Sequence, residues 1–589
     1  MAAYSIANSV ALGAQVRTHE RQPGEPPSRP LKVFTIDPSV RAREGAIAIA
    51  RVPYEPLTPG PIGALFEVEA ADGPVLLAPA NLDDPPVLIN SGIEPSVQNP
   101  AFHQQMVYAV ASSVYALFRL ALGRVVAWGF DAEESPSDTT RRLKLRPHVA
   151  GIGANAGYDK KAGEIRFGYY QSDATVTGRN LPGGLVFTCL SHDIIAHEVT
   201  HALIDGLRSR FTIPTGPDVL GFHEGISDMV AVFHHFLYPE ALAAQIRKVG
   251  PDVERSGLLT AVAANLGLTA TAGGALREAF DPKQAIRYHA GLEAHDMGTV
   301  LLVAMFEAYM TVFRRKAGRY LHLAPPQREG VWPEDLVKLL ADQASSLARQ
   351  FLVLAIRAVD YCPPVDLELG EYLRALITAD YILVPDDPWC YREALIEAFA
   401  NHGIYPNAVM HLSEDSLLWR PPARPLPVIP TLSFANLHFS GDPSHPASAD
   451  ELIAQATALG DFITQPQWCC EFGLVPPDAD VDPPAIQSIR TSRRVGPDGQ
   501  VLFDLVAEVT QRRRVRDPKT GTGALLFGGA TIIVGPLGEI RYVIAKSVMN
   551  QQRLDRQLAF QAQSDFWQKT DGQYRLAGDV LGMLHKRKG

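Results

Sequence analysis

The segment 197–201 contains His197, Glu198 and His201, a combination that could hold a metal ion. Four residues make about one helical turn, so both imidazoles would project from one face of a helix, with the carboxylate beside them. Two imidazoles leave a tetrahedral zinc ion short of one protein ligand and one open position. The segment therefore predicts a Zn²⁺ centre. Glu198 cannot easily bind the same ion as its neighbours and is expected to act as the general base of a hydrolytic reaction.

A pair of carboxylates further along the chain completes the expected centre. Glu224 follows His201 after enough residues for one helix to end, a loop to form and a second helix to begin. Asp228 lies four positions further on and shares the helix face of Glu224. We therefore expect Glu224 to be the third ligand and Asp228 to accept the far N–H of a ligating histidine. The alternative for Asp228 alone is a carboxylate on a helix surface.

Apolar residues surround both segments, at 194–196 and 202–204 around the histidines and at 229–230 beyond the carboxylates. Helices that are apolar on most faces are buried. Histidines on a buried helix need partners, and a metal ion supplies one. The alternative, two unrelated histidines on a core or surface helix, leaves those side chains without such a partner.

Several segments resemble those of one enzyme family. The stretch 197–202 resembles the first motif of the thermolysin-type zinc metallopeptidases (gluzincins), and 224–228 is similar to their second motif, E-x-x-x-D. The resemblance covers a catalytic region of about residues 150–405. Further segments that are similar to parts of that region are 155–159, 293–298 and 391–404.

The resemblance implies a fold and roles for particular residues. The fold would be α+β, with two thermolysin-like lobes, β-rich at the N-terminal side and helical at the C-terminal side, and with the cleft between them. Asn155 and Ala156 would bind the substrate backbone, and His295 would stabilise the transition state. The cofactor would be Zn²⁺, held by His197, His201 and Glu224.

Some of the family's residues have no obvious counterpart here. The family normally carries a tyrosine between its first two motifs that helps to stabilise the oxyanion, and residues 202–223 contain none. The aminopeptidase signature G-x-M-E-N is also missing, which favours an endopeptidase. Alternatives to the tyrosine are Arg208, Arg210 and His223, and candidates for a substrate-binding arginine are Arg287 and Arg277.

These observations leave more than one function open. The leading hypothesis is a zinc-dependent endopeptidase that hydrolyses internal bonds of a peptide or protein. The alternative is a catalytically weak or inactive thermolysin-like protein that acts as a binding or scaffold module. Hydrolysis of a non-peptide amide is a third option. The missing tyrosine favours the scaffold, whereas the intact Glu198 favours catalysis.

Composition bounds the class of protein. The 589 residues are 46% hydrophobic and 20% charged, which is typical of globular chains with several domains. A net charge of −10 argues against nucleic-acid binding. The five cysteines include no C-x-x-C spacing and predict no disulfide framework. We see no signal peptide and no membrane span, so we expect a cytoplasmic protein, with signal-independent export left open.

Composition shifts along the chain predict its organisation. The expected accessory module carries no catalytic constellation, and a protein partner could bind through it. The predicted parts are a flexible N-terminus (1–30), a β-rich lobe (31–188), a helical zinc-binding lobe (189–410), a proline-rich linker (411–431) and an α+β accessory domain (432–589). Helices are predicted at 99–123, 190–208, 221–237, 239–248, 296–315, 332–359, 366–379, 389–402, 449–463 and 546–570.

Overall fold

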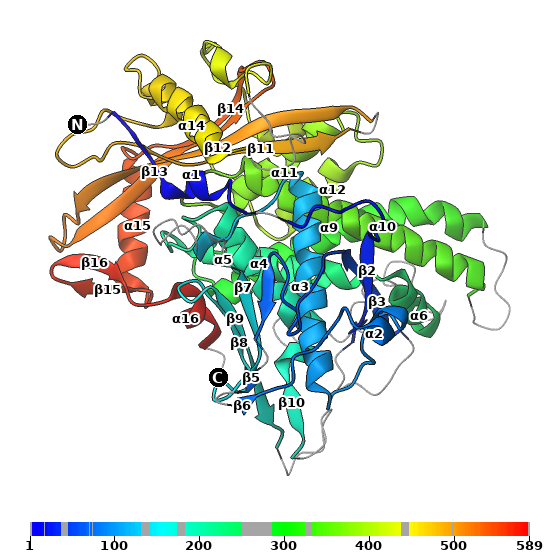
Figure 1. Ribbon diagram of the computed structural model, residues 1–589. Helices are drawn as coiled ribbons and strands as arrows, with labels where there is room; N and C mark the ends of the chain where they lie inside the picture. Colours follow the sequence, from blue (N-terminus) through cyan, green and yellow to red (C-terminus); the bar gives the residue numbers. More distant parts are fainter. Residues whose placement is uncertain are drawn as a thin grey trace.

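The computed structural model shows a mixed α+β protein with several sheets, which confirms the expected class at this level. In Figure 1 the cyan strands of the N-terminal part lie in the lower half of the molecule, and a second sheet with long orange strands crosses the top. The structure describes residues 3–16, 18–36, 45–69, 71–72, 75–130, 142–173, 183–249, 286–323, 332–437, 447–496 and 499–586.

The N-terminal part contains a five-stranded sheet in the order β10-β9-β7-β4, with β8 paired to β9. The long helix α3 (Pro100–Leu122) packs against strands of this part. The Asn99 side chain accepts a hydrogen bond from the Ala101 N–H at its start, and Gly123 ends it in the left-handed conformation. The strands of the N-terminal part, inside and outside this five-stranded sheet, are β2 (Ser28–Phe34), β3 (Ile47–Pro53), β4 (Phe66–Val68), β5 (Ala71–Asp72), β6 (Val75–Leu76), β7 (Leu143–Val149), β8 (Ala156–Asp159), β9 (Glu164–Gln171) and β10 (Leu185–Phe187). The short helix α2 (Pro85–Ile89) lies in the same part of the chain.

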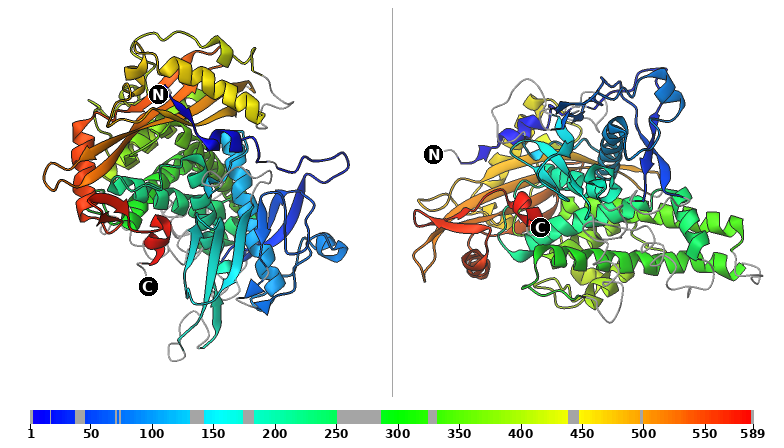
Figure 2. Two further views of the ribbon diagram at one scale, coloured as in Figure 1. Left: turned by 60° about the vertical axis from the view of Figure 1, so that its left-hand side comes forward. Right: turned by 90° about the horizontal axis from the view of Figure 1, so that it is seen from below.

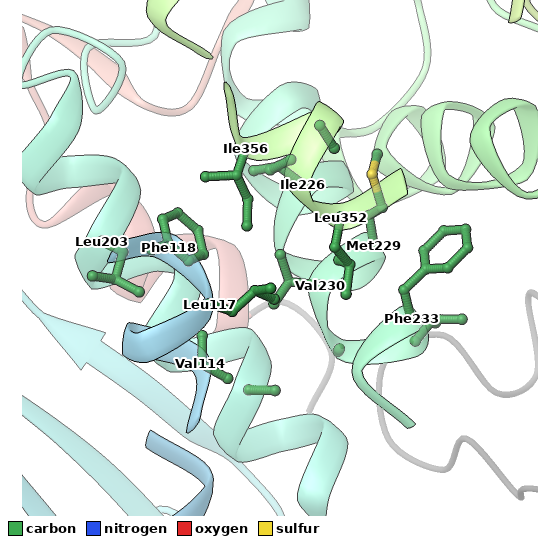
Figure 3. Close-up of a cluster of buried hydrophobic side chains, with 14 of the residues drawn as sticks. Val114, Leu117, Phe118, Leu203, Ile226, Met229, Val230, Phe233, Leu352 and Ile356 are labelled. Carbon is green, nitrogen blue, oxygen red and sulfur yellow. The ribbon is translucent and has the colours of Figure 1, made fainter. Parts of the chain in front are cut away.

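The helical part packs around an apolar core to which α3 also contributes. Side chains of α3, α4, α5 and α10 gather in the cluster that Figure 3 draws, and its labelled members are 0–4% exposed. Burying one such side chain contributes about 1.5–3 kcal/mol. The helices are α4 (His192–Leu207), α5 (Pro217–His235), α6 (Pro239–Val249), α9 (Ala294–Leu323), α10 (Glu334–Ala358), α11 (Leu369–Leu383), α12 (Tyr391–Asn401) and α13 (Glu414–Leu417).

The C-terminal module is built on a seven-stranded sheet in the order β1-β11-β12-β13-β16-β15, with β14 paired to β13. Figure 2 shows α14 lying along this sheet. The elements are β1 (Ser5–Ile6), α1 (Asn8–Leu12), α14 (Ala449–Ile463), β11 (Ala485–Val495), β12 (Val501–Arg516), β13 (Gly523–Val534), β14 (Ile540–Lys546), α15 (Gln551–Gln563), β15 (Trp567–Thr570), β16 (Gln573–Leu576) and α16 (Val580–Lys586).

The two faces of this sheet belong to different cores. Leu505, Ala507 and Val509 of β12 pack in one core with α14, whereas Val506 and the β13 residue Ile533 join the core of the helical part. Successive residues of a strand point to opposite faces, so one sheet serves both layers. The module is therefore packed onto the helical part.

Two arginines link the motif helix α4 to the C-terminal module. Arg490 of β11 donates to the carbonyl oxygens of Gly206 (3.2 Å) and Leu207 (3.1 Å), which end α4. Arg208, the next residue, donates to the Thr531 hydroxyl of β13 (3.0 Å). The last carbonyls of a helix have no partner within it, so Arg490 satisfies them from another module.

Part of the segment 1–30, which was expected to be flexible, is packed against the C-terminal module. Ser5–Ile6 pairs in parallel with β11, and Val10 and Leu12 of α1 are buried. The helix α1 contacts α14. A two-residue strand and a five-residue helix are too short to give a periodic pattern, and their partners lie hundreds of residues later in the chain.

Two further expectations about the C-terminal half change. The proline-rich stretch 411–431 is anchored near both ends: Leu417 is fully buried, the Trp419 indole N–H donates to the Tyr361 carbonyl (2.9 Å) and the Ile429 N–H to the Gly538 carbonyl (2.8 Å). Most of the residues between these anchors are exposed. The helix predicted at 546–570 begins later and ends earlier than expected, as α15, and is followed by a hairpin and by α16.

Within the part of the chain that the structure describes, two helices are long and apolar enough to cross a membrane, α3 and α9. In their most apolar windows 78% and 83% of the residues are buried inside the protein. Burial of this kind is typical of the central helices of a globular fold.

Candidate metal centre

The helices α4 and α5 bring the three expected ligands together. His197, His201 and Glu224 are fully buried. The Nε2 atoms of the two histidines lie 3.0 Å apart. The Glu224 carboxylate faces both, with Oε2 at 3.4 Å from Nε2 of His197 and Oε1 at 3.6 Å from Nε2 of His201.

These separations suit a tetrahedral metal ion. With zinc–nitrogen bonds of about 2.0–2.1 Å, neighbouring ligand atoms of a tetrahedral site lie about 3.3 Å apart. Within the described residues neither oxygen of Glu224 accepts a hydrogen bond. A buried carboxylate without hydrogen bonds is costly, and a bound dication would offset that cost. The donor set of two imidazoles and a carboxylate therefore fits Zn²⁺.

The ring nitrogens that face away from this cluster have partners of their own. Nδ1 of His197 lies 2.9 Å from Oδ1 of Asp228. Nδ1 of His201 lies 2.8 Å from Nδ1 of His223 and 3.3 Å from the Ser227 hydroxyl. Such contacts fix ring orientation and leave each Nε2 pointing at the shared centre.

The charges around the centre follow from burial and mutual contact. Burial raises the pKa of Glu224, but His197 and the surrounding imidazoles outweigh it and hold that pKa well below its usual range. Burial lowers the pKa of His197, yet the carboxylates of Asp228 and Glu224 hold it well above its usual value. Burial lowers the pKa of His201 well below its usual value. A metal ion would therefore compete with a proton at His197 and meet a neutral imidazole at His201.

Glu198 is held beside the cluster by the strand β8. Its Oε2 accepts a hydrogen bond from the backbone N–H of Tyr158 (3.0 Å), and the residue is 2% exposed. Ala156 begins the same strand, which contacts α4, and Asn155 directly precedes it. Both expected substrate-binding residues therefore lie close in the chain to Tyr158, whose N–H holds Glu198.

His295 also reaches the cluster, from the first turn of α9. Its Nε2 lies 3.4 Å from Oε2 of Glu224, and its Nδ1 lies 3.1 Å from Oε1 of Glu293. Two glycines allow this approach: a Cβ added to Gly298 would lie 2.7 Å from the backbone nitrogen of Gly225 on α5. The close crossing of α5 and α9 brings His295 to Glu224.

The three alternatives to the missing tyrosine do not face the cluster. His223 contacts the rear nitrogen of His201. Arg208 is turned toward the C-terminal sheet, and Arg210 lies over the ring of Phe527, with 5.0 Å between the guanidinium carbon and the ring centroid. An oxyanion partner from residues 202–223 is therefore not in place.

The two arginines considered for substrate binding have no established place at the centre. Arg287 is exposed, and its neighbour Tyr288 donates its N–H to the His402 carbonyl (2.9 Å) after α12. Arg277 lies outside the described residues.

His585 of α16 is the member of the cluster that the sequence did not indicate. It joins His197, His201 and Glu224 in a buried group whose ligand atoms all lie within 4.8 Å of one another. Its ring centroid lies 5.4 Å from that of His201. A single histidine in a short, basic segment has no partner at a metal-binding spacing, so the sequence does not predict this role. His585 reaches the cluster because the C-terminal end of the chain folds back to α4.

A second group of metal-binding side chain types consists of His103, His148 and Cys189. Nδ1 of His103 lies 2.8 Å from Nε2 of His148, and its Nε2 lies 3.2 Å from the Val97 carbonyl. Both ring nitrogens of His103 are thus engaged by protein atoms, as expected of a core histidine pair.

No family model and no curated protein with which the chain was compared matches it.

Proposed function

We propose that this chain is a zinc-dependent endopeptidase with a thermolysin-like catalytic region. The observation that supports the proposal most is the buried convergence of His197, His201 and Glu224, with no hydrogen bond to the Glu224 oxygens within the described residues. The adjacent carboxylate of Glu198 lies outside this ligand set and is available for proton transfer.

A zinc ion held by these ligands would act as a Lewis acid toward water and the peptide carbonyl. Glu198 has one oxygen fixed by the Tyr158 N–H, which leaves Oε1 to take a proton from the attacking water and pass it to the leaving amine. His295 lies beside Glu224 and donates, in this proposal, to the oxygen that becomes negative. Glu293 orients that imidazole through its other nitrogen.

The strand β8 supports the assignment of a peptide substrate. It pairs with β9 on one side, and within the described residues no strand pairs with its other side. An extended peptide can add to such an edge through backbone hydrogen bonds. Asn155 and Ala156 lie at this edge, just before Tyr158, whose N–H holds Glu198. In this proposal they bind the backbone of the substrate peptide.

The test compares the full chain with Glu198→Gln on an unfolded protein such as reduced casein and on a panel of internally quenched peptides. Metal content is measured on both proteins. We expect stoichiometric zinc in each and a loss of hydrolysis of about 10²–10⁴-fold in the variant. Glu240→Gln, an exposed carboxylate of α6, is the matched control. Zinc-bound protein whose hydrolysis does not depend on Glu198 would overturn the proposal.

One observation favours a second function, a zinc-binding scaffold without turnover. Arg208, Arg210 and His223 all turn away from the cluster, so a donor for the oxyanion is missing from that side. Stoichiometric zinc with no hydrolysis of any substrate, in the wild type and in a His585→Ala variant, would favour the scaffold.

A further inference from the structure

The C-terminal helix α16 lies against the candidate metal centre. Figures 1 and 2 show it, in red, beside the strands of the N-terminal sheet, and it contacts β8. The Asn155 side-chain N–H donates to the backbone carbonyl of His585 (3.3 Å). A residue proposed to hold the substrate backbone therefore holds the backbone of the chain's own C-terminal helix.

The His585 imidazole points to the centre rather than to a partner of its own. Its side chain is 6% exposed, and within the described residues its Nε2 makes no hydrogen bond. The same atom lies 3.9 Å from Oε1 of Glu198. A buried imidazole nitrogen without a hydrogen bond is unfavourable, and ligation of a metal ion would satisfy it.

The apolar face of α16 holds this histidine in place. Val580, Leu581 and Leu584 are 0–6% exposed and belong to the main core. The Gly582 N–H donates to the Asp579 side chain (3.2 Å) at the start of the helix. Residues 577–579, which connect β16 to α16, are exposed. The helix α16 is thus packed against the core, whereas the segment that connects it to β16 is exposed to solvent.

We propose that His585 is the fourth protein ligand of the metal ion and that α16 keeps the centre closed to substrate. This inference rests on the proposed function. His197, His201, Glu224 and His585 would form a closed tetrahedral set, as in structural zinc sites, whereas hydrolysis needs the fourth position open. The chain would therefore be latent as folded, and loss of His585 or displacement of α16 would open it.

The position of His585 would block both the binding of water at the metal and the binding of the substrate backbone. His585 would fill the position that water needs, next to Oε1 of Glu198. Its carbonyl would occupy Asn155, which the substrate backbone needs. A substrate must therefore displace both the ligand and the backbone contact, which disfavours binding as well as turnover.

The direct test counts ligands rather than activity. Full-length protein loaded with zinc is measured by X-ray absorption spectroscopy, and protein loaded with Co²⁺ by visible absorption. We expect three imidazoles for the wild type, and two imidazoles with an added water oxygen, and a changed Co²⁺ spectrum, for His585→Ala. The conservative variant His585→Cys should keep a four-coordinate spectrum with a sulfur ligand. His411→Ala, an exposed histidine, is the matched control and should match the wild type.

A second readout measures access to the centre. A small hydroxamate should bind His585→Ala at least about tenfold more tightly than the wild type, and hydrolysis of a quenched peptide should rise by a similar factor. His585→Gln provides the same comparison with a side chain of similar size, should the alanine variant fold poorly. Two imidazoles in the wild type, or equal hydroxamate affinity in wild type and variants, would overturn the inference.

Failure of the inference and failure of the proposed function give different results. Two imidazoles in the wild type together with Glu198-dependent hydrolysis would reject the closed centre and keep the peptidase. Three imidazoles in the wild type with no hydrolysis in His585→Ala would keep the closed centre and reject the peptidase. Protein that binds neither zinc nor Co²⁺ would overturn both.

Discussion

Nδ1 of His197 lies 2.9 Å from Oδ1 of Asp228, on the side of the imidazole opposite the candidate metal position. Both residues are almost fully buried, and their helices α4 and α5 pack against each other. The carboxylate gives the N–H of Nδ1 an acceptor and orients the ring so that Nε2 faces His201 and Glu224. A metal ion bound there would displace the proton that this carboxylate and Glu224 favour on His197.

Replacing Asp228 by Asn should weaken metal binding. The amide keeps the shape of the side chain but removes the charge that orients the His197 ring and increases its basicity. We expect zinc affinity to fall by about 10–100-fold, measured by competition with a chromophoric chelator. Asp296→Asn changes an exposed carboxylate next to His295 and should leave the affinity unchanged. Equal affinities of Asp228→Asn and wild type would contradict the assigned role.

Zinc should stabilise the folded chain through Glu224. A ligand that binds only the folded state adds about 4 kcal/mol of stability at a concentration of 1,000 Kd. We expect zinc to raise the Tm of the wild type by several degrees and to leave the Tm of Glu224→Gln nearly unchanged, because the amide is a poor ligand. Differential scanning fluorimetry with and without zinc measures both. Glu240→Gln should respond like the wild type.

The crossing of α5 and α9 predicts a sharp difference between two glycines of one helix. A Cβ at Gly298 would lie 2.7 Å from the Gly225 nitrogen and 2.8 Å from Cβ of Glu224, whereas a Cβ at Gly318 meets nothing within 4 Å. Gly298→Ala should lower the free energy of unfolding by about 1–3 kcal/mol, since the helices must move apart. It should also reduce zinc affinity through the displaced Glu224.

Gly318→Ala is the control for that experiment, in the same helix. Alanine is favoured over glycine inside a helix, so its free energy of unfolding should stay equal to the wild type or rise by up to about 1 kcal/mol. Urea titrations of the three proteins give the comparison. Similar stabilities for both alanine variants would mean that the helices do not cross as closely as described.

A buried histidine far from the centre predicts how stability depends on pH. Burial, with a smaller effect of the neighbouring His148, lowers the pKa of His103 to about 4. In the unfolded chain a histidine has a pKa of about 6.5. Between these values the unfolded state binds more protons, so stability is lost as the pH falls below 6.5. The loss between pH 7 and pH 5 should be about 2 kcal/mol from this residue.

The corresponding measurement compares wild type and His103→Gln in urea titrations at pH 7 and pH 5. Chelator is present, so that metal release does not contribute. The variant, which has no titrating ring at 103, should lose less stability on acidification. His411→Gln changes an exposed histidine and should keep the wild-type dependence. An unchanged dependence in His103→Gln would show that this imidazole does not titrate as described.

Local patterns predicted much of what lies near the motif. The spacing of His197 and His201 specifies one helix face, and α4 indeed presents both Nε2 atoms on one side. The spacing of Glu224 and Asp228 likewise placed one carboxylate at the cluster and the other at the rear of an imidazole. Such features depend on a single helix, so the residues that determine them are close in sequence.

Features that depend on contacts between segments far apart in the chain could not be predicted from these local patterns. His585 reaches the centre only because the chain returns after the hairpin β15–β16, and β1 has its partner in β11 near the other end of the chain. Neither segment is long enough to show a period of its own. The role of His585 and the packing of the first residues are consequences of tertiary contacts, which a single sequence does not display.

The cap that Arg490 places on the last carbonyls of α4 makes the two halves of the molecule hard to separate. A fragment ended at Ile404 would keep every expected zinc ligand from the motifs yet leave Gly206 and Leu207 without these hydrogen bonds and expose the apolar surface under β12 and β13. We expect such a fragment to aggregate on expression. Efforts to trim this protein for crystallisation or engineering should therefore retain the C-terminal sheet and vary the residues after it instead.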